Sequence, residues 1–178
     1  MKSLIATICI LSLVGMVVGV AVKAADTGTV TATVTVQSIS VSVSDGTVAY
    51  GILVVSTSKD TTSVASGGLD DTQVATNNGN VNETLNISGQ NSTPGTWALS
   101  GAAGSEAYVH AFCKAGTGAP DPCDAAPVYT ALTTTYQTLA TPVAPLGTQR
   151  FDLKITTPTA TASFVQQSVN VTIQAVAI

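Results

Sequence analysis

Apolar and polar residues alternate along residues 29–36, where valine or alanine stands at every even position and threonine at every odd one. A period of two is typical of a β-strand with one buried face. The parity then reverses, because the apolar residues of 39–43 fall on odd positions. Since a slip of one residue turns the other face inward, this reversal predicts a bulge or a change of sheet near Gln37 and Ser38.

Two dipeptides that favour tight turns predict hairpins further along the chain. The Asp-Gly pair at 45–46 predicts that residues 48–52 run back beside the first strands. The Asn-Gly pair at 78–79 predicts a second hairpin, between residues 72–76 and 81–88. Leu85 and Ile87 would face inward in that hairpin.

The later strands follow from the same alternation, and no helical periodicity occurs after the N-terminal segment. Asp152 and Lys154 alternate with apolar neighbours and are expected to face solvent. The chain is therefore expected to be all-β, a two-sheet antiparallel β-sandwich of jelly-roll or immunoglobulin-like type, with a β-barrel as the alternative. The later strands are expected at residues 97–99, 108–113, 128–132, 136–139, 151–155 and 169–177.

The first 24 residues have the features of a secretory signal peptide. Lys2 precedes an apolar run over residues 4–22, and Ala24 is a small residue at a suitable cleavage point. An uncleaved membrane anchor is the alternative, since about 18 apolar residues can span a bilayer. The sequence predicts a signal-peptide helix at 1–24, then one sandwich domain at 25–178, which is secreted or held at the cell surface.

Cleavage would leave four basic residues against ten acidic ones, a formal charge of −6. Nucleic acids and anionic membranes bind clusters of lysine and arginine, so both are poor partners for this chain. Membrane contact is expected only if the signal segment stays as an anchor. Self-association, other surface proteins and glycans remain as partner classes.

Cys113 and Cys123 are the two cysteines of the predicted mature chain, and the segment between them is rich in glycine and proline. An even number of cysteines in an exported chain is usually oxidised, so we expect a disulfide rather than two free thiols. Cys9 lies in the signal segment.

Residues 56–71 form a long polar connection that holds Asp60, Asp70 and Asp71. These carboxylates are candidates for a calcium site, because Ca²⁺ binds several oxygen ligands. The alternative is a solvated acidic loop, since the spaced aspartate pattern of calcium loops is missing. Four positions match the N-glycosylation pattern Asn-x-Ser/Thr, namely Asn82, Asn86, Asn91 and Asn170.

No catalytic arrangement is evident. His110 is the single histidine, and no serine or cysteine nucleophile motif accompanies it. A hydrolase would need two carboxylates facing each other across a cleft, and the spacing of Glu83 and Glu106 does not indicate such a pair. We therefore expect no enzyme activity and no cofactor.

Four short motifs carry a resemblance to known families. Tyr-Gly-Ile-Leu at 50–53, followed by Asn-Asn-Gly-Asn-Val-Asn at 77–82 and Leu-Asn-Ile at 85–87, resembles the exported β-sandwich subunits of the TasA/camelysin type. The resemblance implies a structural subunit of a biofilm fibre or cell surface. Trp-Ala-Leu at 97–99 is similar to the signature of WxL wall-binding domains, but the chain has no second copy.

These observations favour a secreted or cell-surface structural protein, a fibre or coat subunit that assembles by β-strand pairing. Val30, Val34 and Val36 would then belong to an assembly strand that completes a neighbouring subunit, unless residues 29–36 form an ordinary first strand. The competing hypothesis is a carbohydrate-binding module or adhesin that uses Tyr108, Tyr129 or Tyr136.

Overall fold

The computed structural model describes residues 27–116 and 121–178. The signal peptide predicted at residues 1–24 lies outside them. The chain divides into an N-terminal unit that ends at Thr35 and a folded unit from Val36 to Ile178. The described part of the first unit, residues 27–35, has no regular secondary structure.

The regular secondary structure of the folded unit is mainly β-strand. The helical elements among its described residues are a single 3-10 turn, η1 (Val64–Ser66), and one short helix, α2 (Pro122–Ala125). Among the described residues, no helix is long and apolar enough to cross a membrane. The strands are β1 (Val41–Val43), β2 (Ser58–Asp60), β3 (Gln73–Asn77), β4 (Glu83–Gly89), β5 (Ala98–Leu99), β6 (Ala107–Ala115), β7 (Thr130–Ala131), β8 (Gln137–Val143), β9 (Thr148–Thr156) and β10 (Val171–Ala177).

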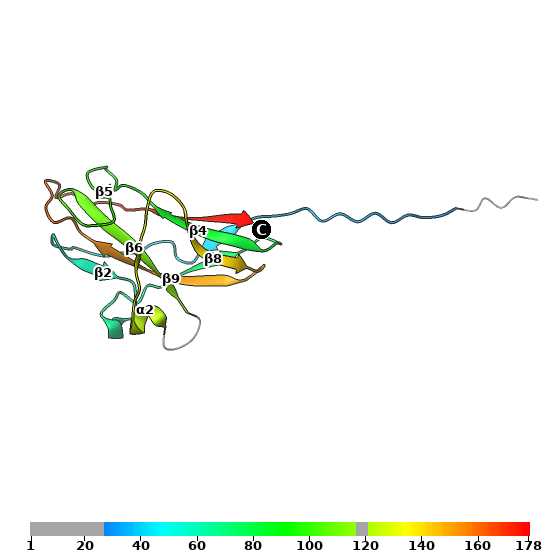
Figure 1. Cartoon of the computed structure of the whole chain (residues 1–178), viewed down its shortest axis with the longest axis horizontal. Helices are drawn as coiled ribbons and strands as arrows, with labels where there is room; N and C mark the ends of the chain where they lie inside the picture. Colours follow the sequence, from blue (N-terminus) through cyan, green and yellow to red (C-terminus); the bar gives the residue numbers. More distant parts are fainter. Residues whose placement is uncertain (1–26, 117–120) are drawn as a thin grey trace, which may run out of the picture. The chain divides into compact units, whose positions relative to one another are not determined.

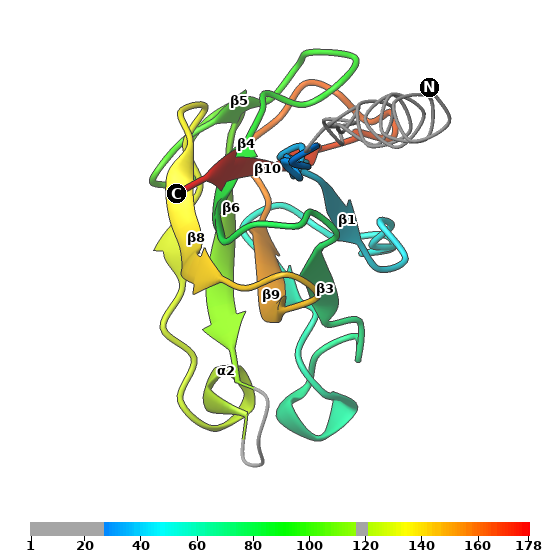
Figure 2. The same cartoon turned by 90° about the vertical axis from the view of Figure 1, so that its right-hand side faces the viewer.

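The strands form two sheets that face each other, as Figures 1 and 2 show. The larger sheet has the order β1-β3-β9-β6-β5, with β2 also paired to β9 and β7 to β6. The smaller sheet has the order β10-β4-β8. All pairings are antiparallel except the short one between β5 and β6. The predicted all-β, two-sheet sandwich is confirmed.

The core lies between the sheets and follows the alternation seen in the sequence. Leu85 and Ile87 of β4 are fully buried against Phe151 and Leu153 of β9 and their neighbours. Side chains at alternate positions of a strand share a face, so each of these strands turns one apolar row inward. The buried core residues are Ala75, Leu85, Ile87, Phe112, Leu132, Leu139, Val143, Phe151 and Leu153.

The predicted first strand at residues 29–36 is not part of the sandwich, so the ordinary-strand alternative is wrong for this structure. Val30, Val34 and Val36 are 93%, 90% and 79% exposed. A strand is held by hydrogen bonds to a neighbouring strand, and this segment has none of the strand pairings found in the folded unit. The sandwich begins with β1, whose Val41 and Val43 do face the core as the parity reversal predicted.

Both predicted hairpins are also wrong. The Asp-Gly turn forms, with Asp45 and Gly46 at φ 60° and 69°, but residues 48–52 form no strand. Instead, β1 pairs with β3. The Asn-Gly turn at 78–79 connects β3 in the larger sheet to β4 in the smaller one, so it joins two layers. Apart from the β5–β6 and β6–β7 pairs, each strand pairs with strands that do not adjoin it in the sequence.

Candidate functional site

The segment 29–36, hereafter the arm, ends at a set of hydrogen bonds with the turn after β3. Asn80 donates from Nδ2 to the carbonyl oxygen of Val36 at 2.8 Å and accepts from the Ser38 amide at 2.8 Å. The Asn80 amide bonds the Ser38 carbonyl, and the Asn78 amide bonds the Ser40 carbonyl. These bonds hold residues 36–40 beside the turn and fix the C-terminal end of the arm.

The turn itself is held from inside by Asn77, whose side chain is fully buried. Its Nδ2 donates to the carbonyl oxygens of Val81 and Val143, both at 2.9 Å, and its Oδ1 accepts from the Gly79 amide at 2.7 Å. A buried amide with its hydrogen bonds satisfied makes the turn rigid. The asparagine-rich run 77–80 therefore positions the base of the arm.

Glu83 adds a further contact to residues 36–40. It was not identified from the sequence as a buried residue. Its side chain is fully buried, and Oε1 accepts from the Ser40 amide at 3.0 Å, while Oε2 has no partner among the described residues. A Cβ at Gly79 would lie 2.5 Å from the backbone carbonyl oxygen of Ser38 and 2.4 Å from that Oε1, so the turn needs glycine there. The sequence held one indication that Glu83 is buried, since position 83 has the same parity as the inward-facing Leu85.

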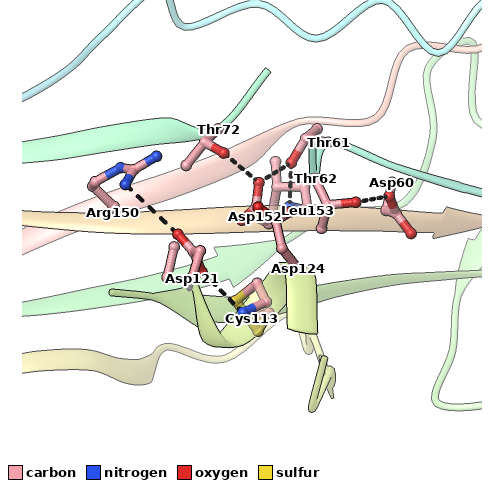
Figure 3. The surroundings of a disulfide bond; sticks show 12 residues. Asp60, Thr61, Thr62, Thr72, Cys113, Asp121, Asp124, Arg150, Asp152 and Leu153 are labelled. Carbon is pink, nitrogen blue, oxygen red and sulfur yellow. Dashed lines mark hydrogen bonds and ion pairs between the residues drawn. A yellow bond between two sulfur atoms is a disulfide. The ribbon is translucent and has the colours of Figure 1, made fainter. Parts of the chain in front are cut away.

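The predicted disulfide between Cys113 and Cys123 is confirmed, with a sulfur–sulfur distance of 2.03 Å. It joins β6 to α2, as Figure 3 shows. Asp121 caps α2 by accepting from the Cys123 amide at 2.9 Å, and it lies 3.6 Å from the Arg150 guanidinium. The bond therefore fixes a small helix against the outer face of the larger sheet, far along the chain from the arm.

Removing this disulfide should lower stability without unfolding the sandwich. A bridge that closes a loop of ten residues contributes about 2 to 3 kcal/mol to the free energy of unfolding. We expect a double substitution, Cys113→Ser with Cys123→Ser, to lose about that amount in urea unfolding. A loss above about 5 kcal/mol would show instead that the sandwich depends on the bridge to fold.

Asp152 is buried, so the expectation that it faces solvent is wrong. Its Oδ1 accepts from the hydroxyls of Thr61 and Thr72 at 2.9 and 2.8 Å, as seen in Figure 3. Burial raises the pKa of Asp152, while the two hydrogen bonds act in the opposite direction. The predicted polar connection 56–71 covers this carboxylate, because part of it forms β2 and pairs with β9.

The acidic residues mostly have structural partners. Asp60 accepts from the Thr62 hydroxyl at 2.6 Å, and Asp71 accepts from the Gln73 side chain at 2.8 Å. Asp70 has a positive backbone φ of 56°, which lies in the left-handed region. Within the described ranges, the metal-ligating atoms that lie within 4.8 Å of one another belong to Asp121, Cys123 and Asp152.

The group formed by Asp121, Cys123 and Asp152 offers no open cation site. The Cys123 sulfur is used by the disulfide, and Asp121 is occupied as a helix cap and ion-pair partner. Calcium binding by Asp60, Asp70 and Asp71 stays a prediction.

His110 lies in the core on β6 and is 2% exposed. Its Nε2 is 3.0 Å from the Tyr50 hydroxyl, and its Nδ1 has no partner in the part of the chain that the structure describes. Burial lowers the pKa of His110 from 6.5 to about 4. Burial likewise raises the pKa of Tyr50 well above 10. The pair joins residues 48–52 to the larger sheet, which is a structural role.

The other predicted site residues do not gather at one place, and they differ in exposure. Tyr108 is fully buried and bonds the Gln90 carbonyl, whereas Tyr136 is 47% exposed and Tyr129 is half-buried beneath Lys154. The three tyrosines therefore form no common aromatic platform for a sugar. Of the four asparagines in glycosylation patterns, Asn82, Asn91 and Asn170 are exposed and Asn86 is half-buried.

The most unusual surface of the described chain is the arm, which exposes valines and carries no charge. Comparisons of the chain with family models, curated proteins and solved structures found no match. Function must therefore be inferred from this chain's own surfaces. An uncharged strand sequence without a strand partner is the feature with the clearest consequence, because such a segment binds other strand edges.

Proposed function

We propose that the chain is a secreted or cell-surface structural protein, a subunit of an extracellular fibre or coat that assembles by β-strand pairing. The observation that carries this proposal is the arm. Its sequence alternates valine or alanine with threonine through residues 29–36, yet Val30 and Val34 are almost fully exposed. Each subunit would insert its arm as a strand into the next subunit.

The energetics favour such insertion. Burying a valine side chain that was exposed contributes about 2 kcal/mol, and the arm has three valines on one face. A paired strand also exchanges backbone–water hydrogen bonds for bonds to the neighbouring strand. Because the arm has no charged residue, no ion has to be desolvated when it docks.

The anchor at the base of the arm supports the same role. Asn80 bonds the carbonyl of Val36 and the amide of Ser38, and Glu83 bonds the amide of Ser40. A fixed start allows the arm to leave the sandwich at a defined point, which a regular polymer requires. The disulfide is consistent with an extracellular location, since such bonds persist in oxidising compartments.

The test compares the mature chain, starting at Ala25, with a chain that starts at Gln37. Electron microscopy and sedimentation should show polymers of the mature chain and only soluble particles of the shortened one. A synthetic peptide of residues 28–37 should bind the shortened chain. Polymers that form equally well without the arm would refute the proposed role, and so would a mature chain that stays monomeric at all concentrations.

A further inference from the structure

We infer that the free edge of β10 is where the arm of a second copy of this chain docks. The inference rests on the proposed function, and it names the accepting surface that the proposed function leaves open. β10 is an edge of the smaller sheet, whose order is β10-β4-β8. All seven residues of β10 pair with β4 on one side, and no described strand pairs with β10 on the other.

The core beside this edge is incompletely covered. Val171, Ile173 and Ala175 of β10 pack against the central cluster but are only half-buried. Across the interior, Val41 and Val43 of β1 pack on the same cluster and are also half-buried. β1 and β10 approach each other at this side, and each is the edge strand of its sheet. An added strand beside β10 would cover both apolar rows.

The other edges are poorer acceptors. β8, the opposite edge of the smaller sheet, contains Pro142, which has no amide hydrogen, and its pairing with β4 is broken by register shifts near Leu85. Proline and irregular pairing are common means of blocking an edge. In the larger sheet, β1 has three residues, and β5 and β7 have two each. β10 is thus the one long, regular edge among the described strands.

The arm matches the edge of β10 in length and chemistry. The arm has eight residues and β10 has seven, and neither contains a charged residue. Each alternates its side chains between two faces, so the even-numbered valines of the arm would turn inward beside Ile173 while its threonines face solvent with Gln174. A second copy supplies this strand in a polymer, with backbone hydrogen bonds along the whole of β10.

Cysteine pairs in the full mature chain test this inference. Gln174 of β10 and Thr138 of β8 both lie directly opposite Asn86 of β4, one on each side, and both are exposed. We would combine Gln174→Cys with Thr31→Cys, Thr33→Cys or Thr35→Cys in three separate variants, because neighbouring strands bring such residues within disulfide reach. The matched controls carry Thr138→Cys in place of Gln174→Cys.

After assembly and oxidation, at least one Gln174→Cys variant should give a ladder of covalent dimers, trimers and longer species on non-reducing gels. The Thr138→Cys variants should stay monomeric on the same gels. A ladder confined to Thr138→Cys, or fibres without a ladder in any variant, would overturn the assignment to β10 while leaving strand-mediated assembly standing. Absence of fibres from the unmodified chain would refute the proposed function itself.

Discussion

Replacing Val30 and Val34 by aspartate is expected to abolish polymer formation, while replacing Thr31 and Thr33 by aspartate should preserve it. In a docked arm the even positions face the core of the neighbour, and a buried carboxylate without a partner costs several kcal/mol. The odd positions would face solvent, where a carboxylate stays hydrated. Light scattering with electron microscopy would measure the outcome.

The two double variants are matched, because both add two negative charges to the same five-residue stretch, 30–34. General repulsion between subunits is therefore the same in both, and only the face differs. Equal loss of polymers in the two variants would contradict docking by one face of a strand. Neither variant alters a residue of the core, so both should unfold in urea at the same midpoint as the unmodified chain.

Acid should destabilise the sandwich through His110. The native state takes up a proton there only near pH 4, since burial lowers the pKa of His110 from 6.5 to about 4. The unfolded chain binds the proton at the ordinary value, so protons favour unfolding as the pH falls. Between about pH 7 and pH 4 this one group should lower the free energy of unfolding by about 3 kcal/mol.

His110→Gln provides the comparison, because its amide can still bond the Tyr50 hydroxyl and does not titrate. Urea unfolding of both proteins across this range cancels the contributions of the carboxylates that they share. The wild-type protein should lose stability relative to the variant as the pH falls from 7 to 4. A difference between the two proteins that does not change with pH would show that His110 is not held neutral.

Much of the fold was predictable because alternation is a local property. The inward rows of β4 and β9, with Leu85 and Ile87 and with Phe151 and Leu153, follow from the period of two. The disulfide followed from the count of cysteines and the loop between them.

Pairing could not be predicted, because it depends on which edges meet in three dimensions. The Asp-Gly turn at 45–46 is local and does form, with positive φ at both residues. Asn78 and Gly79 lack the positive φ values of such a turn, and the core selects β3 as the partner of β1, with β4 placed in the other sheet. Glu83 and Asp152 were missed as buried groups for a similar reason. Their hydrogen-bond donors come from Ser40 and from Thr61, far away in the sequence.

Hydrogen exchange at the amides of residues 29–36 tests the central claim most directly. In the dilute monomer these amides should exchange at the rate of an unstructured peptide, since the arm has no regular secondary structure. In the assembled polymer about every second amide of the arm should become protected, because one edge of the inserted strand bonds to its neighbour. Arm amides that exchange as fast in the polymer as in the monomer would contradict assembly by strand insertion.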